Sequence, residues 1–342
     1  MKRFFVRLGR FFWSWGFLKF VLGVLALVIL FYVEEDSRGA RTWADTKARW
    51  EAKGESFDYN KFIPPPVADD QNLAAIPLFK LESVKDIEGR SQLEAVNLQK
   101  AMGEDYPHYN LPSLGAWQKG ELPDMNNLKQ VIASNYSAVF KNGKPPDGTL
   151  AQFDAMYPFV ADFLAAASTR HRFRYSENYY TLLPPVFRPL GPITMPIKLS
   201  QILSLHAVLA LDHQQSDLAL EDIEASNTLA LGIRHDPSLI GGLVALGILA
   251  VSHSALYDGL VCHHWNDVQL AEVEHALGPW NLLDDYRLSV RSEAAESVAN
   301  LELYKKLGSR NNLEDWFFDS DRSVPFVLWA SPPWPRSLLK KA

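Results

Sequence analysis

The first 36 residues constrain this chain most, because they pair a basic end with a long apolar run. The run, Phe17–Val33, contains one charged residue, Lys19, and ends at Glu34. A helix over residues 11–33 would rise about 34 Å, which is enough to cross the hydrocarbon core of a bilayer. The basic residues before the run are Lys2, Arg3, Arg7 and Arg10, and acidic residues follow it. This asymmetry predicts a cytoplasmic N-terminus and an exported body.

A cleaved signal peptide is the alternative to a retained anchor. The apolar run is longer than the apolar core of a signal peptide, which is about 7–15 residues. The stretch that ends the run, residues 31–36, also lacks the small residues of a cleavage site. We therefore expect a signal anchor with a single pass through the membrane.

The composition after the anchor is that of a folded, acidic protein. Hydrophobic residues make up 47% of the chain and charged residues 22%, so the chain can bury a core. The first 33 residues hold five of the 34 basic residues and no acidic one, which leaves 29 basic against 40 acidic residues. A charge of about −11 on this part argues against nucleic acid as a partner. Cys262 is the one cysteine, so no internal disulfide forms.

Proline and glycine divide the exported part. A helix is expected over residues 40–53, with Gly54 as its stop, and the three prolines 64–66 then impose an extended strap. The expected divisions are a cytoplasmic basic N-terminus (1–16), a transmembrane anchor (17–33), a stalk helix and proline-rich strap (34–80), an irregular helical subdomain (81–195), a helical-repeat core (196–308) and a tail rich in Trp and Pro (309–342).

Helical periodicity is weaker in the irregular subdomain than in the core. Short helices are expected at 91–102 and 126–140, and a helix over 150–169 that Pro158 either kinks or divides into two pieces. An extended segment is expected over 170–175. In the core, Pro196 opens a series of helices at 197–214, 217–234, 237–263, 267–278 and 281–307. The short links between them predict antiparallel neighbours.

The expected starts of the core helices carry capping signals. Ser216 and Asn266 are good N-caps, and Asn266 with Gln269 forms a capping-box pattern. Pro237 fits the first turn of the third helix. The apolar part of that helix, residues 239–251, is too short to cross a membrane, which predicts a buried central helix.

An internal repeat supports stacked helix pairs. Residues 213–224 align with residues 263–274, with identities that include Asp217/Asp267 and Leu220/Leu270. Two copies of a helix pair, stacked as in a solenoid of the tetratricopeptide (TPR) or HEAT kind, would explain this match. Coincidence between two amphipathic helices is the alternative. The predicted fold class is all-α: one N-terminal transmembrane helix and an antiparallel helical body with a solenoid-like repeat.

Several stretches of the chain carry a resemblance. They are the strap at 62–74, the segment 172–175, the helix 202–211, residues 217–222 and residues 235–244. Together they resemble an uncharacterised family of bacterial proteins, each with an N-terminal membrane anchor and an exported all-helical body. The resemblance implies an anchor in the inner (cytoplasmic) membrane and a periplasmic body. It supplies no catalytic residues.

Motifs for known chemistry are absent from the sequence, so no cofactor is expected. There is no nucleophile elbow, P-loop, zinc-protease helix or paired Cys-x-x-Cys. His206 and His213 lie seven residues apart and share a helix face, as metal ligands do. That face also carries Ile202, Leu205 and Leu209, which favours histidines buried in the core.

One basic and aromatic cluster stands out in the acidic body. Its members are Arg170, His171, Arg172, Arg174, Tyr175, Tyr179 and Tyr180. Arginine matches carboxylate and phosphate groups, and tyrosine supplies contact area, so the cluster is a candidate site for an anion or a partner protein. Simple pairing with nearby acidic residues is the alternative.

These observations favour binding over catalysis. The expected function is a non-catalytic, membrane-tethered scaffold or a protein- or peptide-binding module on the outer face of the inner membrane. Its contact surface would be the groove of helices 197–278 with the cluster at 170–180. The alternative is an envelope-associated hydrolase, either with or without a metal ion, whose catalytic groups are His206, His213 and nearby carboxylates.

Overall fold

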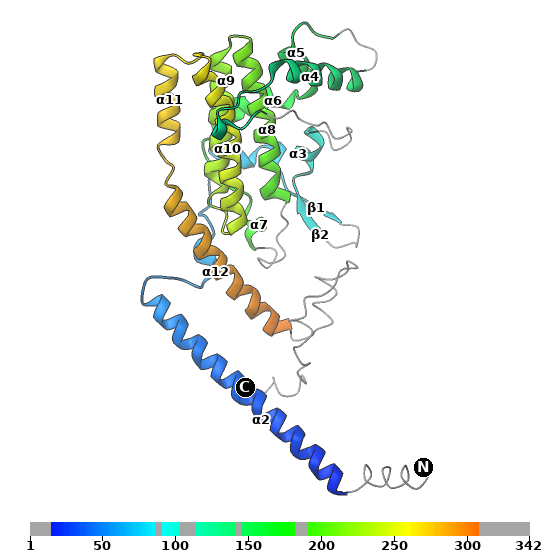
Figure 1. Cartoon of the computed structure of the whole chain (residues 1–342), viewed down its shortest axis with the longest axis vertical. Helices are drawn as coiled ribbons and strands as arrows, with labels where there is room; N and C mark the ends of the chain where they lie inside the picture. Colours follow the sequence, from blue (N-terminus) through cyan, green and yellow to red (C-terminus); the bar gives the residue numbers. More distant parts are fainter. Residues whose placement is uncertain (1–14, 86–90, 103–113, 141–144, 182–190, 308–342) are drawn as a thin grey trace, which may run out of the picture. The chain divides into compact units, whose positions relative to one another are not determined.

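The computed structural model of the chain is mostly helical (Figure 1). It describes residues 15–85, 91–102, 114–140, 145–181 and 191–307. The chain divides into two compact units, Met1–Phe57 and Asp58–Ala342, and each is described by itself. The predicted basic N-terminus, up to residue 14, and the predicted tail lie outside the described residues.

The described part of the first unit, residues 15–57, contains one long helix, α2 (Trp15–Glu51). The predicted anchor and stalk helix are therefore parts of a single element. The helix continues through the acidic residues after the apolar run, and these pair with basic residues later in α2. Arg38 contacts Glu35 at 2.7 Å one turn later, and Arg41 contacts Glu34 at 3.5 Å two turns later. Gly54, with a φ of +88°, closes the helix end as expected.

Within the described residues, three helices are long and apolar enough, by length and composition, to cross a membrane, and they differ in how much of their apolar surface the protein buries. They are α2, α8 (Gly191–Asp212) and α10 (Leu239–Val261). The protein buries 78% of the apolar window of α8 and 50% of that of α10, but none of that of α2. The prediction that the apolar part of the third core helix, residues 239–251, is too short to cross was wrong, because α10 stays apolar enough on average beyond Ser252. The Ser252 hydroxyl bonds the Leu249 carbonyl within the helix at 3.0 Å.

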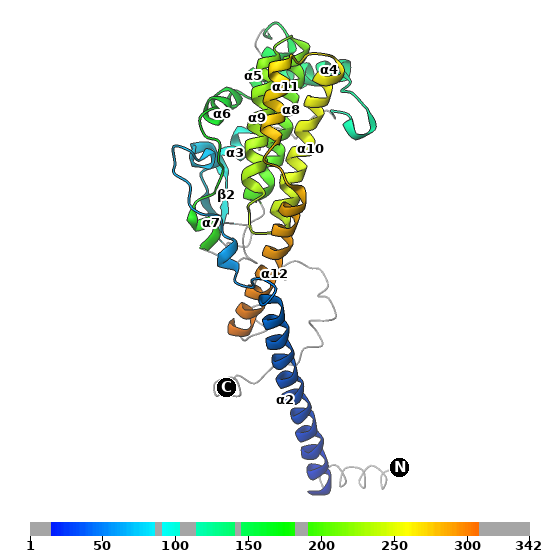
Figure 2. The ribbon, with the colours of Figure 1, turned by 90° about the vertical axis from the view of Figure 1, so that its left-hand side faces the viewer.

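The second unit is built around three helices that pack against one another: α8, α9 (Ser216–Ile233) and α10 (Figures 1 and 2). Nearly all of α8 is buried because it is apolar all round. Two further helices complete this region, α11 (Asp267–Leu277) against α9 and α12 (Leu282–Leu307) against α10. The all-α prediction is confirmed at this level.

The start of α8 differs from the prediction. The helix begins at Gly191, and Pro196, the expected opening residue, lies inside it. A proline at this position has no N–H for the carbonyl four residues earlier, which is that of Pro192. The hydroxyl of Tyr175 donates to this carbonyl instead. A contact from a distant segment therefore compensates for the proline.

Two of the predicted caps were misplaced and one is confirmed. Asn266 and Gln269 form the complete capping box of α11. Ser216 is the first residue of α9 and not its cap. In α10 the cap is Ser238, whose hydroxyl accepts from the Gly241 N–H at 3.0 Å, so Pro237 precedes the helix.

The remaining elements lie around the core helices (Figure 1). They are α3 (Val96–Ala101), α4 (Met125–Val139), α5 (Thr149–Met156), α6 (Phe159–Ala167), α7 (Glu177–Thr181) and the antiparallel strands β1 (Glu82–Lys85) and β2 (Ser91–Glu94). Of these, α5 and β2 lie against α8, and α6 lies against α9. Pro158 separates α5 from α6, as predicted. The strand pair was not predicted, and β2 occupies the start of the helix expected at 91–102.

The two aligned segments of the internal repeat lie in helices that touch. The side-chain amide of Gln269 in α11 donates to Asp217 in α9 at 2.6 Å and to Ser216 at 3.0 Å. Gln269, which belongs to the capping box of α11, therefore also holds the first turn of α9 in place. The solenoid-like repeat itself stays a prediction.

Candidate functional site

The proline strap is attached to the segment that carries the predicted basic cluster. The Asn72 side chain donates to the Arg174 carbonyl at 2.8 Å and accepts from its N–H at 2.9 Å. Next to it, the Leu73 N–H donates to the Arg172 carbonyl at 2.7 Å. This bond and the one from the Arg172 N–H to the Gln71 carbonyl, at 3.2 Å, form an isolated parallel bridge between Asn72 and Arg172. The backbone is therefore extended at Arg172, as predicted, whereas the Arg170 N–H still bonds the Ala166 carbonyl at the end of α6.

A cavity of about 450 Å³ lies where the strap, this segment, the end of α9 and α12 meet. We call it the strap pocket. Its lining residues are Lys61, Phe62, Ile63, Pro64, Pro65, Val67, His171, Arg172, Phe173, Arg174, Leu231, Gly232, Arg234, His235 and Leu288. This volume lies within the range of sites that hold small ligands or short segments of a partner.

Every ionisable side chain among the described residues that line the strap pocket is basic, although the whole chain is acidic. Lys61 and Arg172 are exposed, and the side chain of neither makes a hydrogen bond or ion pair with the described residues. A cation that the protein leaves unpaired at the edge of a cavity is free to meet an anionic group. These two side chains are the strongest candidate ligand contacts.

Two other lining arginines are occupied by the protein itself. Arg174 is buried, donates to the Pro64 carbonyl at 2.8 Å and to Glu177 at 2.6 Å, and lies over the Tyr180 ring. Arg234 donates to the Pro279 carbonyl at 2.9 Å and pairs with Asp285 at 3.3 Å. These side chains position the strap and α12 and keep little capacity for a ligand.

His235, which follows the end of α9, adds a polar surface to the pocket but little positive charge. Partial burial lowers the pKa of His235, and the positive charge of Arg234 lowers it further. His235 is therefore largely neutral at neutral pH. The net positive charge available to a ligand comes from Lys61 and Arg172.

The three tyrosines of the predicted cluster lie inside the protein. Tyr175, Tyr179 and Tyr180 are at most 5% exposed, and they continue a series of ring contacts that begins at Phe79 and passes through Phe173. Burial raises the pKa of Tyr175 well above its usual value. The rings support the backbone that carries His171 and Arg172, and these two residues are the ones of this group that are exposed.

The last member of the predicted cluster, Arg170, lies beside the pocket and not in its lining. Its guanidinium donates to the Asp69 carbonyl at 3.4 Å, which adds a further contact between the strap and the extended segment. Of the seven predicted residues, the structure brings His171, Arg172 and Arg174 to the strap pocket.

The close packing behind the pocket depends on one glycine. A Cβ atom on Gly232 would lie 2.2 Å from the Cβ of Phe173 and 2.7 Å from its carbonyl oxygen. Only a residue without a side chain lets the end of α9 approach the extended segment this closely. Gly232 therefore fixes the inner wall of the pocket.

Sequence reasoning missed the residues that other elements bring to the pocket. Lys61 comes from a short 3-10 helix, Tyr59–Phe62, whereas Arg234 and His235 follow the end of α9. These residues are more than 100 positions apart along the chain, and no spacing pattern connects them. The strap and the cluster were each noted in the sequence, but nothing in either signalled that they form one cavity.

The predicted metal or acid–base histidines occupy different environments. His206 in α8 is 4% exposed, and its Nδ1 lies 2.7 Å from the wholly buried carboxylate of Asp222. Its Nε2 lies 3.0 Å from the carboxylate of Asp154 on α5. The ring also stacks on Phe153, with centroids 5.9 Å apart. His213 is exposed, and its Nδ1 bonds the carbonyl of Leu209 at the end of the same helix.

This pairing controls the protonation of His206. Burial lowers its pKa, but the hydrogen bonds to Asp154 and Asp222 outweigh that effect and raise the pKa to about 9. Burial raises the pKa of Asp222 to about 6. At neutral pH the imidazolium donates both N–H groups to carboxylates, which leaves no free nitrogen to bind a metal or accept a proton.

The described residues hold no group of three or more His, Cys, Asp and Glu side chains with the geometry of a metal site. The trio Asp154, His206 and Asp222 instead joins α5, α8 and α9. One oxygen of Asp222 has no hydrogen-bond partner among the described residues, so the trio is sensitive to any change in its charges.

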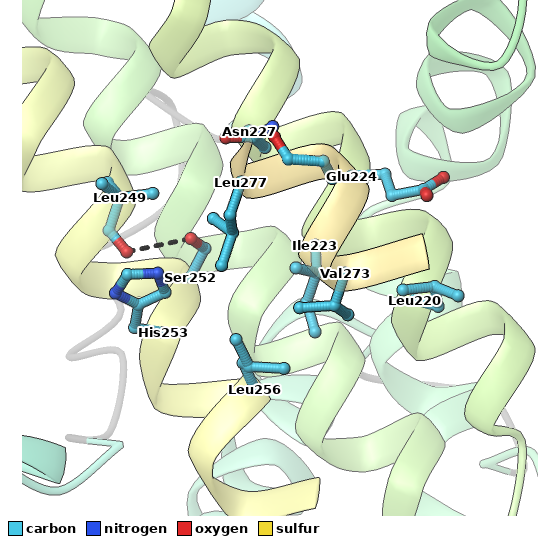
Figure 3. A pocket seen from close by; sticks show the side chains of 11 residues that line it. Leu220, Ile223, Glu224, Asn227, Leu249, Ser252, His253, Leu256, Val273 and Leu277 are labelled. Carbon is cyan, nitrogen blue, oxygen red and sulfur yellow. Dashed lines mark hydrogen bonds between the residues drawn. The ribbon is translucent and has the colours of Figure 1, made fainter. Parts of the chain in front are cut away.

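A second, much smaller pocket lies between α9, α10 and α11 (Figure 3). Its volume of about 10 Å³ holds no more than one water molecule. Ile223, Leu249 and Leu256 surround it, and burial lowers the pKa of His253 at its edge. We interpret it as a packing defect between helices.

Comparisons with protein-family models, with curated proteins and with solved structures found no match to this chain.

Proposed function

We propose that this protein is a non-catalytic, membrane-tethered binding module that holds a protein or peptide partner in the strap pocket. The observation that carries this proposal is a cavity of about 450 Å³ whose ionisable lining residues are all basic, in an acidic chain. Lys61 and Arg172 are left unpaired at its edge, so a partner's anionic groups would find contacts there without breaking existing ones.

The proposal includes a location and a topology. Helix α2 is the single anchor, in the inner membrane, with residue 1 in the cytoplasm and the body in the periplasm. The basic residues before the apolar run support this orientation. The coverage of α8 and α10 by the second unit supports their assignment to the body. Stacking of α8–α9 with α10–α11 as solenoid-like pairs is part of the same proposal.

The environment of His206 supports binding over the enzyme alternative. A general base needs a free nitrogen and a pKa near the working pH. His206 has both nitrogens bonded to carboxylates and a pKa of about 9. It therefore serves to hold helices together, and we assign the function to the strap pocket.

Site-specific photocrosslinking in cells tests the proposal. A benzophenone amino acid replaces Pro65, which is exposed and lines the pocket, or Lys119, which is exposed and does not line it. We expect one defined protein to be crosslinked from position 65 and not from position 119. Crosslinking of the same proteins from both positions, or of none from position 65, would contradict the proposal.

A further inference from the structure

We infer that the strap pocket recognises an acidic peptide segment with an apolar anchor residue between its acidic side chains. This inference rests on the proposed function and narrows it to one class of partner. It follows from where the pocket carries its charge and where it carries its apolar surface.

The free charge lies at the edge of the pocket and on separate elements. Lys61 belongs to the short helix that begins the strap, and Arg172 belongs to the extended segment attached to its far end. Both side chains are exposed. Two free cations on two elements suit two or more anions spaced along a chain, as in a peptide with several carboxylates.

Apart from Arg174, which the protein itself holds, the less exposed part of the lining is largely apolar. Ile63 and Pro64 on the strap are half-buried, and Phe173 is buried. Leu231 and Leu288 contribute from α9 and α12. An apolar side chain that enters this space is removed from water, which stabilises the complex.

The distribution of charge also favours a peptide over a single-chain anionic lipid. A lipid of that kind presents one headgroup, and its recognition needs cations that converge on one point. In the strap pocket, the other two arginines are held by Glu177 and Asp285, and His235 has a lowered pKa. The remaining cations sit on different elements, so we commit to the peptide.

The test is a selection from a phage-displayed library of random twelve-residue peptides against the full-length chain in phosphatidylcholine nanodiscs. We expect enriched sequences with Asp or Glu on both sides of Leu, Phe or Trp. The most enriched peptide is then labelled, and its affinity is measured by fluorescence anisotropy. Replacement of its acidic residues by amides, or of its apolar anchor by Ala, should weaken binding about tenfold or more.

Charge reversal in the protein supplies the matched controls. Lys61→Glu and Arg172→Glu should each weaken peptide binding about tenfold or more, and Arg172→Lys should restore part of it. Lys119→Glu makes the same charge change on an exposed lysine outside the pocket and should leave the affinity within about twofold. Far-UV circular dichroism confirms that each variant is folded.

Three results would overturn the inference. They are a selection without acidic enrichment, equal sensitivity to Lys119→Glu and Arg172→Glu, and binding of dodecyl phosphate that depends on Arg172 when no peptide binds. If position 65 still crosslinks a protein in cells, the proposed function stands and only the acidic class of partner fails. If the selection enriches no acidic peptide and position 65 crosslinks no protein, the proposed function fails as well.

Discussion

At the scale of single residues, the trio Asp154, His206 and Asp222 places a buried histidine between two carboxylates. His206→Ala would leave Asp222 buried without its partner, and such a loss destabilises a protein by about 3–5 kcal/mol. His213→Ala, which removes one bond to a helix carbonyl, should change the free energy of unfolding by about 1 kcal/mol or less. Urea unfolding followed by circular dichroism measures both. Equal stabilities for the two variants would contradict this account.

The same trio gives the protein a defined pH dependence. The pKa of His206 is about 9 in the folded state and 6.5 ordinarily, so its contribution is fully present below pH 6.5. It is lost as pH rises through 9, at up to about 1.4 kcal/mol per pH unit. Asp222 also has a raised pKa, of about 6, so its contribution to stability is likewise lost as the pH rises, but at lower pH than that of His206. We expect His206→Gln to flatten the fall in unfolding free energy between pH 6.5 and 9, whereas an unchanged slope would show that other groups cause it.

At the scale of elements, the strap pocket depends on two backbone contacts that single substitutions remove. Gly232→Ala forces α9 away from Phe173, because the new Cβ would lie 2.2 Å from the Phe173 Cβ. We expect a destabilisation of about 1–3 kcal/mol and weaker binding in the pocket. Gly191→Ala is the control, since nothing lies within 4 Å of that position. Equal effects of the two substitutions on thermal unfolding would refute the role given to Gly232.

Asn72 holds the strap against the extended segment. Asn72→Ala removes both of its bonds to Arg174, and each buried group left unpaired destabilises the protein by about 1–3 kcal/mol. Amide hydrogen exchange should accelerate at residues 172–174. Asn60→Ala, which removes an exposed bond to Asp58, should leave that exchange unchanged. Unaltered exchange in Asn72→Ala would mean that other contacts hold the strap.

The sequence predicted elements well where a local signal decides the structure. The capping box of Asn266 and Gln269 and the break at Pro158 are set by residues within one turn, and both are confirmed. Pro196 was misread because the Tyr175 hydroxyl, from a distant segment, compensates for it. The strap pocket was missed for the same reason. Its two sides meet through Asn72 and Arg172, and local patterns do not encode such a contact.

At the scale of the whole molecule, Cys262 makes the topology measurable without added probes. It is the one cysteine of the chain and it is exposed. Slight burial and the neighbouring Asp258 raise its pKa, so labelling is done at mildly alkaline pH. We expect a membrane-impermeant maleimide to label Cys262 in intact spheroplasts. A Cys262→Ser, Lys2→Cys variant should be labelled only after lysis, and the opposite pattern would reverse the proposed orientation.

The central claim is that Arg172 and the strap pocket hold a partner outside the membrane. The most direct measurement is photocrosslinking from position 65 in cells, with Arg172 intact and with Arg172→Glu. The account predicts a defined crosslinked partner that Arg172→Glu abolishes and that Lys119→Glu leaves in place. A crosslink that survives Arg172→Glu would contradict the claim that this arginine binds the partner.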